Sequence, residues 1–148
     1  MTTYSLPKLN LKQPLGKLLA STGACLYARK WAKAAGFKTA AEAWNKCPHP
    51  HWMLWALQRA GMDNSPDTKR KLRRFAGWCA KQAHIPHYRS YSAFSSATGT
   101  AAAAAITIAD RNHDICSDGS WKRCHAFACA LQAHELRRIL GNPFESRQ

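Results

Sequence analysis

Acidic residues are scarce in this sequence, which has 8 Asp and Glu against 22 Lys and Arg in 148 residues and a formal net charge of +14 at pH 7. This balance excludes a mimic of nucleic acid, whose surface would have to be acidic. It also leaves few carboxylates for acid–base catalysis. Because solubility requires a net charge of only about 2–8 in magnitude, the excess predicts a partner that is acidic or carries phosphate.

Long hydrophobic runs are also missing. The most apolar stretch, residues 101–109, is too short and too rich in Ala and Thr to cross a bilayer. The first ten residues lack the charged-then-apolar pattern of a secretion signal. Six cysteines are fewer than a small disulfide-stabilised domain carries. We therefore expect a cytoplasmic protein with reduced thiols and no membrane partner.

Strand patterns are absent, since no alternation of apolar and polar residues exceeds four positions, and there is no internal repeat. Helix boundaries, in contrast, are well marked. Thr39 with Glu42 forms a capping-box pattern. Ser65, Pro66 and Asp67 combine a cap, a proline and a first-turn acid. The sequence therefore predicts an all-α fold, a single compact domain of five or six helices.

The expected organisation is an N-terminal arm and turn over residues 1–20, followed by a helical domain over residues 21–148. The third expected helix is apolar on nearly every side, which is typical of a buried helix. Most of the six tryptophans should lie in the core. The expected helices cover residues 21–35, 39–47, 50–60, 65–83, 91–115 and 121–140. The first of these has an expected apolar face of Ala24, Tyr27, Ala28, Trp31 and Ala35.

The helix expected over residues 65–83 separates charge from apolar side chains. Its apolar face consists of Leu72, Phe75, Ala76, Cys79 and Ala83. The candidate residues for binding a partner or phosphate are Lys69, Arg70, Arg73, Arg74 and Lys81, with Trp78 at the border of the two faces. Other cations could extend this surface: Arg29, Lys30, Lys33, Arg59, Arg123, Arg137 and Arg138. The ordinary alternative is a solvated helix face without a partner.

Histidine and cysteine form two groups that a metal or thiol enzyme could use. The first group is Cys47, His49 and His51. The second group is His113, Cys116, Cys124, His125 and Cys129. Neither contains the CxxC or HxxxH pair that is usual in zinc sites. A glycine-rich phosphate loop, a nucleophile elbow and a zinc-protease motif are missing too.

We therefore predict no enzymatic activity, no catalytic residues, no metal and no cofactor. A zinc- or thiol-dependent enzyme stays an alternative, with Cys47 beside His49 or His51 as its best candidate.

The pattern of Trp, Cys and Ala in residues 24–57 resembles a known family. The residues that carry it are Ala24, Cys25, Ala28, Arg29, Trp31, Ala43, Trp44, Cys47 and the run Trp52-Met53-Leu54-Trp55. The family comprises immunity proteins of bacterial polymorphic-toxin systems (the fifth-type immunity domain), which also occur in phages. The Ala-rich middle and the helix that ends before Pro143-Phe144 are similar to its C-terminal half. Family members often carry an Arg/Gly-Asp pair before the third-helix Trp, where this chain has Pro50-His51.

The resemblance implies an all-α inhibitor that binds its target and brings no catalytic residues. It also implies helix-packing roles for Cys25 and Cys47.

The first functional hypothesis is a non-enzymatic immunity-type or phage anti-defence inhibitor that binds a protein or nucleoprotein target through a basic surface. The alternative is a sequence-nonspecific nucleic-acid-binding protein. Because the sequence resembles no helix-turn-helix, zinc finger or strand-based RNA reader, it would contact the phosphate backbone and not the bases. The oligomeric state stays open.

Overall fold

The computed structural model describes residues 10–82 and 121–145, apart from the side chains at positions 80, 82, 121–125 and 127. This part of the chain contains six helices and no strand, which confirms the all-α fold class. The helices are α1 (Leu15–Ser21), α2 (Leu26–Ala35), α3 (Ala40–Lys46), α4 (Pro50–Arg59), α5 (Pro66–Gln82) and α7 (Trp121–Leu140). The helix expected over residues 91–115 lies outside the described residues.

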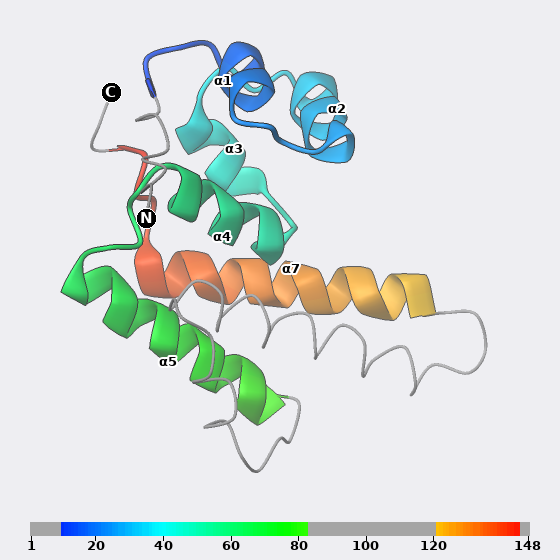
Figure 1. Ribbon diagram of the computed structural model, residues 1–148. Helices are drawn as coiled ribbons and strands as arrows, with labels where there is room; N and C mark the ends of the chain where they lie inside the picture. Colours follow the sequence, from blue (N-terminus) through cyan, green and yellow to red (C-terminus); the bar gives the residue numbers. More distant parts are fainter. Residues whose placement is uncertain (1–9, 83–120, 146–148) are drawn as a thin grey trace, which may run out of the picture.

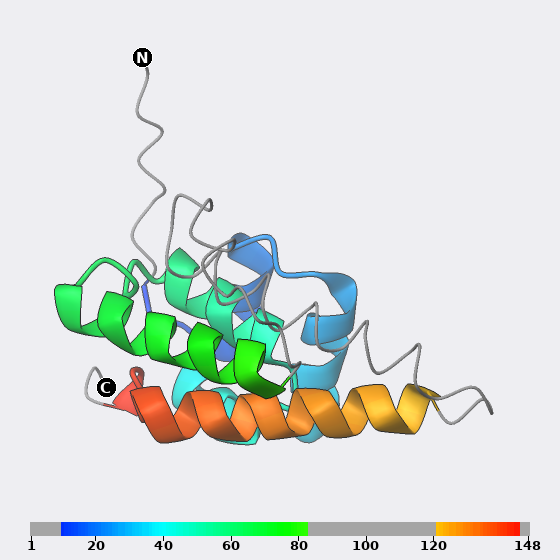
Figure 2. The same cartoon turned by 90° about the horizontal axis from the view of Figure 1, so that it is seen from below.

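The long helix α7 organises the bundle. It contacts α4 on one side and α5 on the other (Figure 1). Turned by 90° in Figure 2, α5 and α7 again lie side by side along most of the length of α5. The short helices α1 and α2 pack against each other at the far end of the bundle from α5.

Local signals place most helix ends where the sequence predicts them. Thr39 Oγ1 accepts the Glu42 N–H at 3.2 Å, and Glu42 Oε2 accepts the Thr39 N–H at 3.4 Å, so the capping box is confirmed. Ser65 Oγ accepts the Thr68 N–H at 3.1 Å at the start of α5. At the other end of a helix, Gly141 has φ 69°, a left-handed conformation that favours glycine.

The main hydrophobic core lies where α4, α5 and α7 meet. Leu57, Leu72, Phe75 and Leu136 have no exposed surface. The predicted apolar face of α5 is therefore confirmed for Leu72, Phe75, Ala76 and Cys79, while Ala83 lies outside the described residues. A second, smaller cluster holds α1 and α2 together through Leu15, Leu18 and Ala32.

The helix start expected at Ser21 is wrong, because residues 15–21 form α1 and α2 begins only at Leu26. Ser21 ends a helix instead of starting one. The hydroxyl groups of Ser21 and Thr22 both donate to the carbonyl of Leu18, at 3.0 and 2.9 Å. Gly23 then takes a left-handed conformation with φ 74°, which turns the chain away from the helix.

The expected apolar face of α2 is also only partly right. Its buried residue is Ala32, whereas Ala35 is exposed and Tyr27 is 78% exposed. Ala24, Ala28 and Trp31 are half-buried. The face is rotated towards Ala32 because α2 packs on α1 through that residue.

Candidate functional site

The basic face of α5 is present as the sequence predicts. Three of its cations, Arg70, Arg74 and Lys81, are exposed on the side of the helix opposite the fully buried Leu72, Phe75, Ala76 and Cys79, and the exposed Lys69 and Arg73 flank them. A helix with this separation fixes its position through its apolar face and presents its charges to solvent or to a partner.

Carboxylates approach this face at two points. Asp67 lies 2.6 Å from Arg70 and 2.8 Å from Lys71, and these two cations lower the pKa of its carboxyl group. Arg74 contributes more weakly to a lowered pKa of Glu135, whose main cause is its hydrogen bond with Arg138. The single carboxylate of Asp67 pairs with both Arg70 and Lys71, so its negative charge does not neutralise the positive charges at the start of α5.

Trp78 is half-buried and not exposed, so it is a weaker contact candidate than the sequence indicates. Its ring packs against the main core and stacks on Phe75, with a centroid separation of 6.4 Å and an interplanar angle of 17°. Its position at the border between the two faces of α5 explains this partial burial.

The other cations that could extend the surface fall into three groups. Arg29, Lys30 and Lys33 are exposed on α2, at the far end of the molecule from α5. Arg137 and Arg138 bind within the fold, and Arg59 lies at the edge of a cleft. The side chain of Arg123 lies outside the part of the chain that the structure describes. The α5 patch is therefore not continuous with the α2 cations through Arg137 or Arg138.

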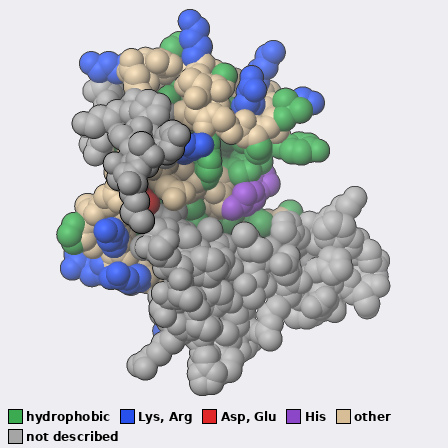
Figure 3. Space-filling view, in the orientation of Figure 1, with side chains coloured by type: hydrophobic (Ala, Val, Ile, Leu, Met, Phe, Trp, Pro, Cys, Tyr) green, Lys and Arg blue, Asp and Glu red, His purple; other side chains and the backbone are tan. Residues whose placement is uncertain are grey.

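A second cationic region covers the N-terminal end of the bundle. Residues 10–38 contain six Lys and Arg, all exposed, and no Asp or Glu: Lys12, Lys17, Arg29, Lys30, Lys33 and Lys38. Figure 3 shows Lys and Arg side chains over α1 and α2 and again near the start of α5, with hydrophobic and His side chains between them.

The thiol alternative gains no support from Cys47. Its side chain is buried, and its Sγ donates to the carbonyl of His49 at 3.4 Å. Burial raises the pKa of this thiol from 9.0 to about 11, so it is neutral at pH 7 and does not supply a thiolate nucleophile. Cys25 is exposed and Cys47 buried, so only Cys47 has the packing role that the family resemblance implies.

A metal site is not visible in the part of the chain that the structure describes, where no three His, Cys, Asp or Glu side chains converge. Of the second His/Cys group, only the buried Cys129 has a described side chain. Within the same residues, no helix combines the length and apolarity that a bilayer crossing requires.

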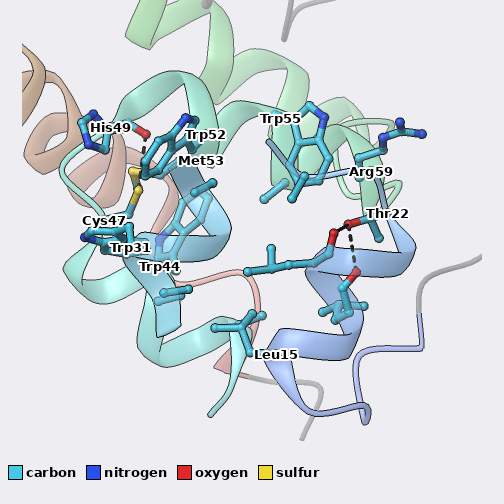
Figure 4. A pocket seen from close by; sticks show the side chains of 18 of the residues that line it. Leu15, Thr22, Trp31, Trp44, Cys47, His49, Trp52, Met53, Trp55 and Arg59 are labelled. Atoms are coloured by element: carbon cyan, nitrogen blue, oxygen red, sulfur yellow. Dashed lines mark hydrogen bonds between the residues drawn. The ribbon is translucent and has the colours of Figure 1, made fainter. Parts of the chain in front are cut away.

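The structure adds a feature that the sequence analysis missed, a cleft of about 940 Å³ bounded by α1, α2, α3 and α4. Figure 4 shows Trp31, Trp52 and Cys47 on one side of it and Trp55, Arg59 and Thr22 on the other. Trp31, Trp52 and Trp55 are half-buried, so the expectation that most tryptophans lie in the core holds fully only for Trp44 among the described ones. The signal that the sequence offered was the number of tryptophans, six in 148 residues, together with alanines on the helices around them.

The comparisons with known proteins do not add a relative: protein-family models, curated proteins and solved structures all gave no match to this chain.

Proposed function

We propose that this chain is a non-enzymatic binding protein, an immunity-type or phage anti-defence inhibitor that acts in the cytoplasm. It binds an acidic protein or nucleoprotein target through the basic face of α5. The observation that carries the proposal is the division of this helix, in which Arg70, Arg74 and Lys81, flanked by Lys69 and Arg73, are exposed while Leu72, Phe75, Ala76 and Cys79 on the opposite face are fully buried. Cations held on a rigid helix steer an acidic partner and set its orientation.

A nucleic-acid-binding protein is the second candidate. It is favoured by the exposed cations of residues 10–38, a stretch that lacks carboxylates entirely. Two separated cationic regions suit a long polyanion better than one compact protein surface.

Matched charge variants distinguish these functions. The test variant is Lys69→Gln/Arg73→Gln/Arg74→Gln on α5. The control removes the same charge from α2, as Arg29→Gln/Lys30→Gln/Lys33→Gln. All these side chains are exposed, so both variants should fold with the circular dichroism of the native protein. Proteins captured from a bacterial lysate, with and without nuclease treatment, are then compared by mass spectrometry.

The proposal expects one dominant protein that the native chain and the α2 variant capture and the α5 variant loses. Equal loss with both variants would show an effect of net charge and would contradict the proposal. A captured protein that disappears after nuclease treatment would favour the second candidate. In that case binding to a labelled DNA duplex should weaken with salt, with a log–log slope of about −0.9 per phosphate neutralised.

A further inference from the structure

The cleft between α1, α2, α3 and α4 reaches into the interior of the protein. Its walls include members of both hydrophobic clusters, and Leu15, Leu18, Trp44 and Met53 on its surface are 2–6% exposed. Protein interiors are close-packed and contain few voids larger than a water molecule. An opening of about 940 Å³ beside core side chains is therefore unusual, and its volume lies within the 300–1,000 Å³ that is typical of small-molecule sites.

The residues around the cleft explain why it stays open. Small side chains line it, Ala24 from the turn before α2 and Ala28, Ala43 and Ala56 from three helices. The large lining side chains include the half-buried Trp31, Trp52 and Trp55. Trp31 leans on Trp52 with ring centroids 5.8 Å apart, so these two form a joined aromatic wall. Aromatic walls with few polar groups are typical of sites for ligands with an apolar body.

The charged residue that lines the cleft indicates which head group a ligand would carry. Among its described lining residues, Arg59 is the sole Lys, Arg, Asp or Glu. The Arg59 guanidinium lies 5.7 Å from the Trp55 ring centroid and next to the turn at Gly23, so it is held at one edge of the cleft (Figure 4). None of the described lining residues is a carboxylate that would attract a cationic ligand, whereas a guanidinium pairs with a carboxylate in a charge-assisted hydrogen bond.

We propose that this cleft binds a small anionic amphiphile, with its apolar body between the tryptophans and a carboxylate head on Arg59. The site differs in place and chemistry from the basic face of α5 and does not depend on the function proposed for that face. A volume of about 940 Å³ suits a ligand with a single chain or ring system.

Titration of the purified full-length protein with dodecanoate, below its micelle concentration, tests the site. Quenching or shift of tryptophan fluorescence reports binding, since four tryptophans line the cleft. Dodecyltrimethylammonium, with the same chain and the opposite charge, is the matched ligand control. We expect saturable binding of one dodecanoate per chain, weaker binding of the cation, and unchanged circular dichroism.

Variants then locate the ligand. Arg59→Gln should weaken dodecanoate binding about tenfold without weakening binding of the cation. Arg29→Gln removes the same charge from a site outside the cleft and should leave the affinity unchanged. Ala28→Phe fills the cleft and should abolish binding, and the α5 triple variant should bind like the native protein.

The proposal is overturned if dodecanoate does not bind, or if both head groups bind equally to the native protein and to Arg59→Gln. It is also overturned if Ala28→Phe binds as tightly as the native chain. If an amphipathic Leu/Glu peptide of about four helical turns binds and dodecanoate does not, the occupant of the cleft is a partner helix and the proposal of a small ligand is wrong.

Discussion

The Arg137 guanidinium donates to the backbone carbonyl of Cys47 at 2.7 Å, across 90 positions of sequence. The same nitrogen donates to the carbonyl of Trp44 at 3.2 Å. Both acceptors belong to the C-terminal end of α3, where the last carbonyls of a helix have no partner within the helix. A cation on α7 thus completes the end of α3 and ties it to the main core.

Replacement of Arg137 by Met should therefore destabilise the fold. It removes two charge-assisted hydrogen bonds and leaves two partly buried carbonyls without their donor, so we expect a loss of about 2–4 kcal/mol in the free energy of unfolding. Urea denaturation followed by circular dichroism measures it. Arg29→Met is the control, because Arg29 is exposed on α2 and loss of the same charge there should cost little. Equal losses in the two variants would contradict the assignment.

Trp44 should be the tryptophan whose replacement costs most. It is 3% exposed, its Nε1 donates to the carbonyl of Gly141 at 2.9 Å, and its ring centroid lies 5.6 Å from that of Phe144. Trp44→Phe loses the hydrogen bond and part of the packing, so we expect thermal unfolding to show a loss of about 2–3 kcal/mol. The half-buried Trp55 serves as reference, and a Trp55→Phe variant that loses as much would argue against this ranking.

Thiol reactivity should separate Cys25 from the other described cysteines. Cys25 is exposed, whereas Cys47, Cys79 and Cys129 are buried with thiol pKa values raised by burial. Because the thiolate is the reactive form, iodoacetamide should label Cys25 first in the native protein. Peptide mapping by mass spectrometry reads out each site. In urea all four should react at similar rates, and fast native labelling of Cys47 would revive the thiol alternative.

Alkaline pH should destabilise the protein in part through Cys79. Burial, assisted by the nearby Glu135 carboxylate, raises the pKa of its thiol from 9.0 to about 12. Below pH 9 both states hold the proton, and this group adds no pH dependence. Between pH 9 and 12 only the unfolded thiol ionises, so stability falls by up to about 1.4 kcal/mol per pH unit.

Cys79→Ala should flatten the alkaline fall in stability relative to the native protein, whatever its constant cost from lost packing. Equilibrium urea unfolding at pH 8, 9.5 and 10.5 measures the two slopes. Parallel slopes would show that the Cys79 thiol is not held protonated in the folded state.

The sequence by itself determined the helical class and most helix ends. Capping boxes and glycine stops act over three or four residues, so Thr39, Ser65 and Gly141 needed no knowledge of the rest of the chain. The basic face of α5 was equally readable, since its apolar and charged residues are sorted by helical spacing alone. The boundary at Ser21 failed because a polar residue that starts a helix can also end one through a hydroxyl bond to an earlier carbonyl.

Only the tertiary structure decided which cations are accessible to a partner and where the cleft between the helices lies. Arg137 and Arg138 are adjacent and chemically identical, yet Arg137 donates to carbonyls of α3, while Arg138 stays exposed and pairs with the buried Glu135 of its own helix. The cleft likewise depends on the packing of α2 against α4, where Trp31 contacts Trp52 and alanines of both helices line the opening, more than 20 residues apart in sequence. Such pairings depend on how the helices pack against one another, and the spacing of residues within one helix does not determine this packing.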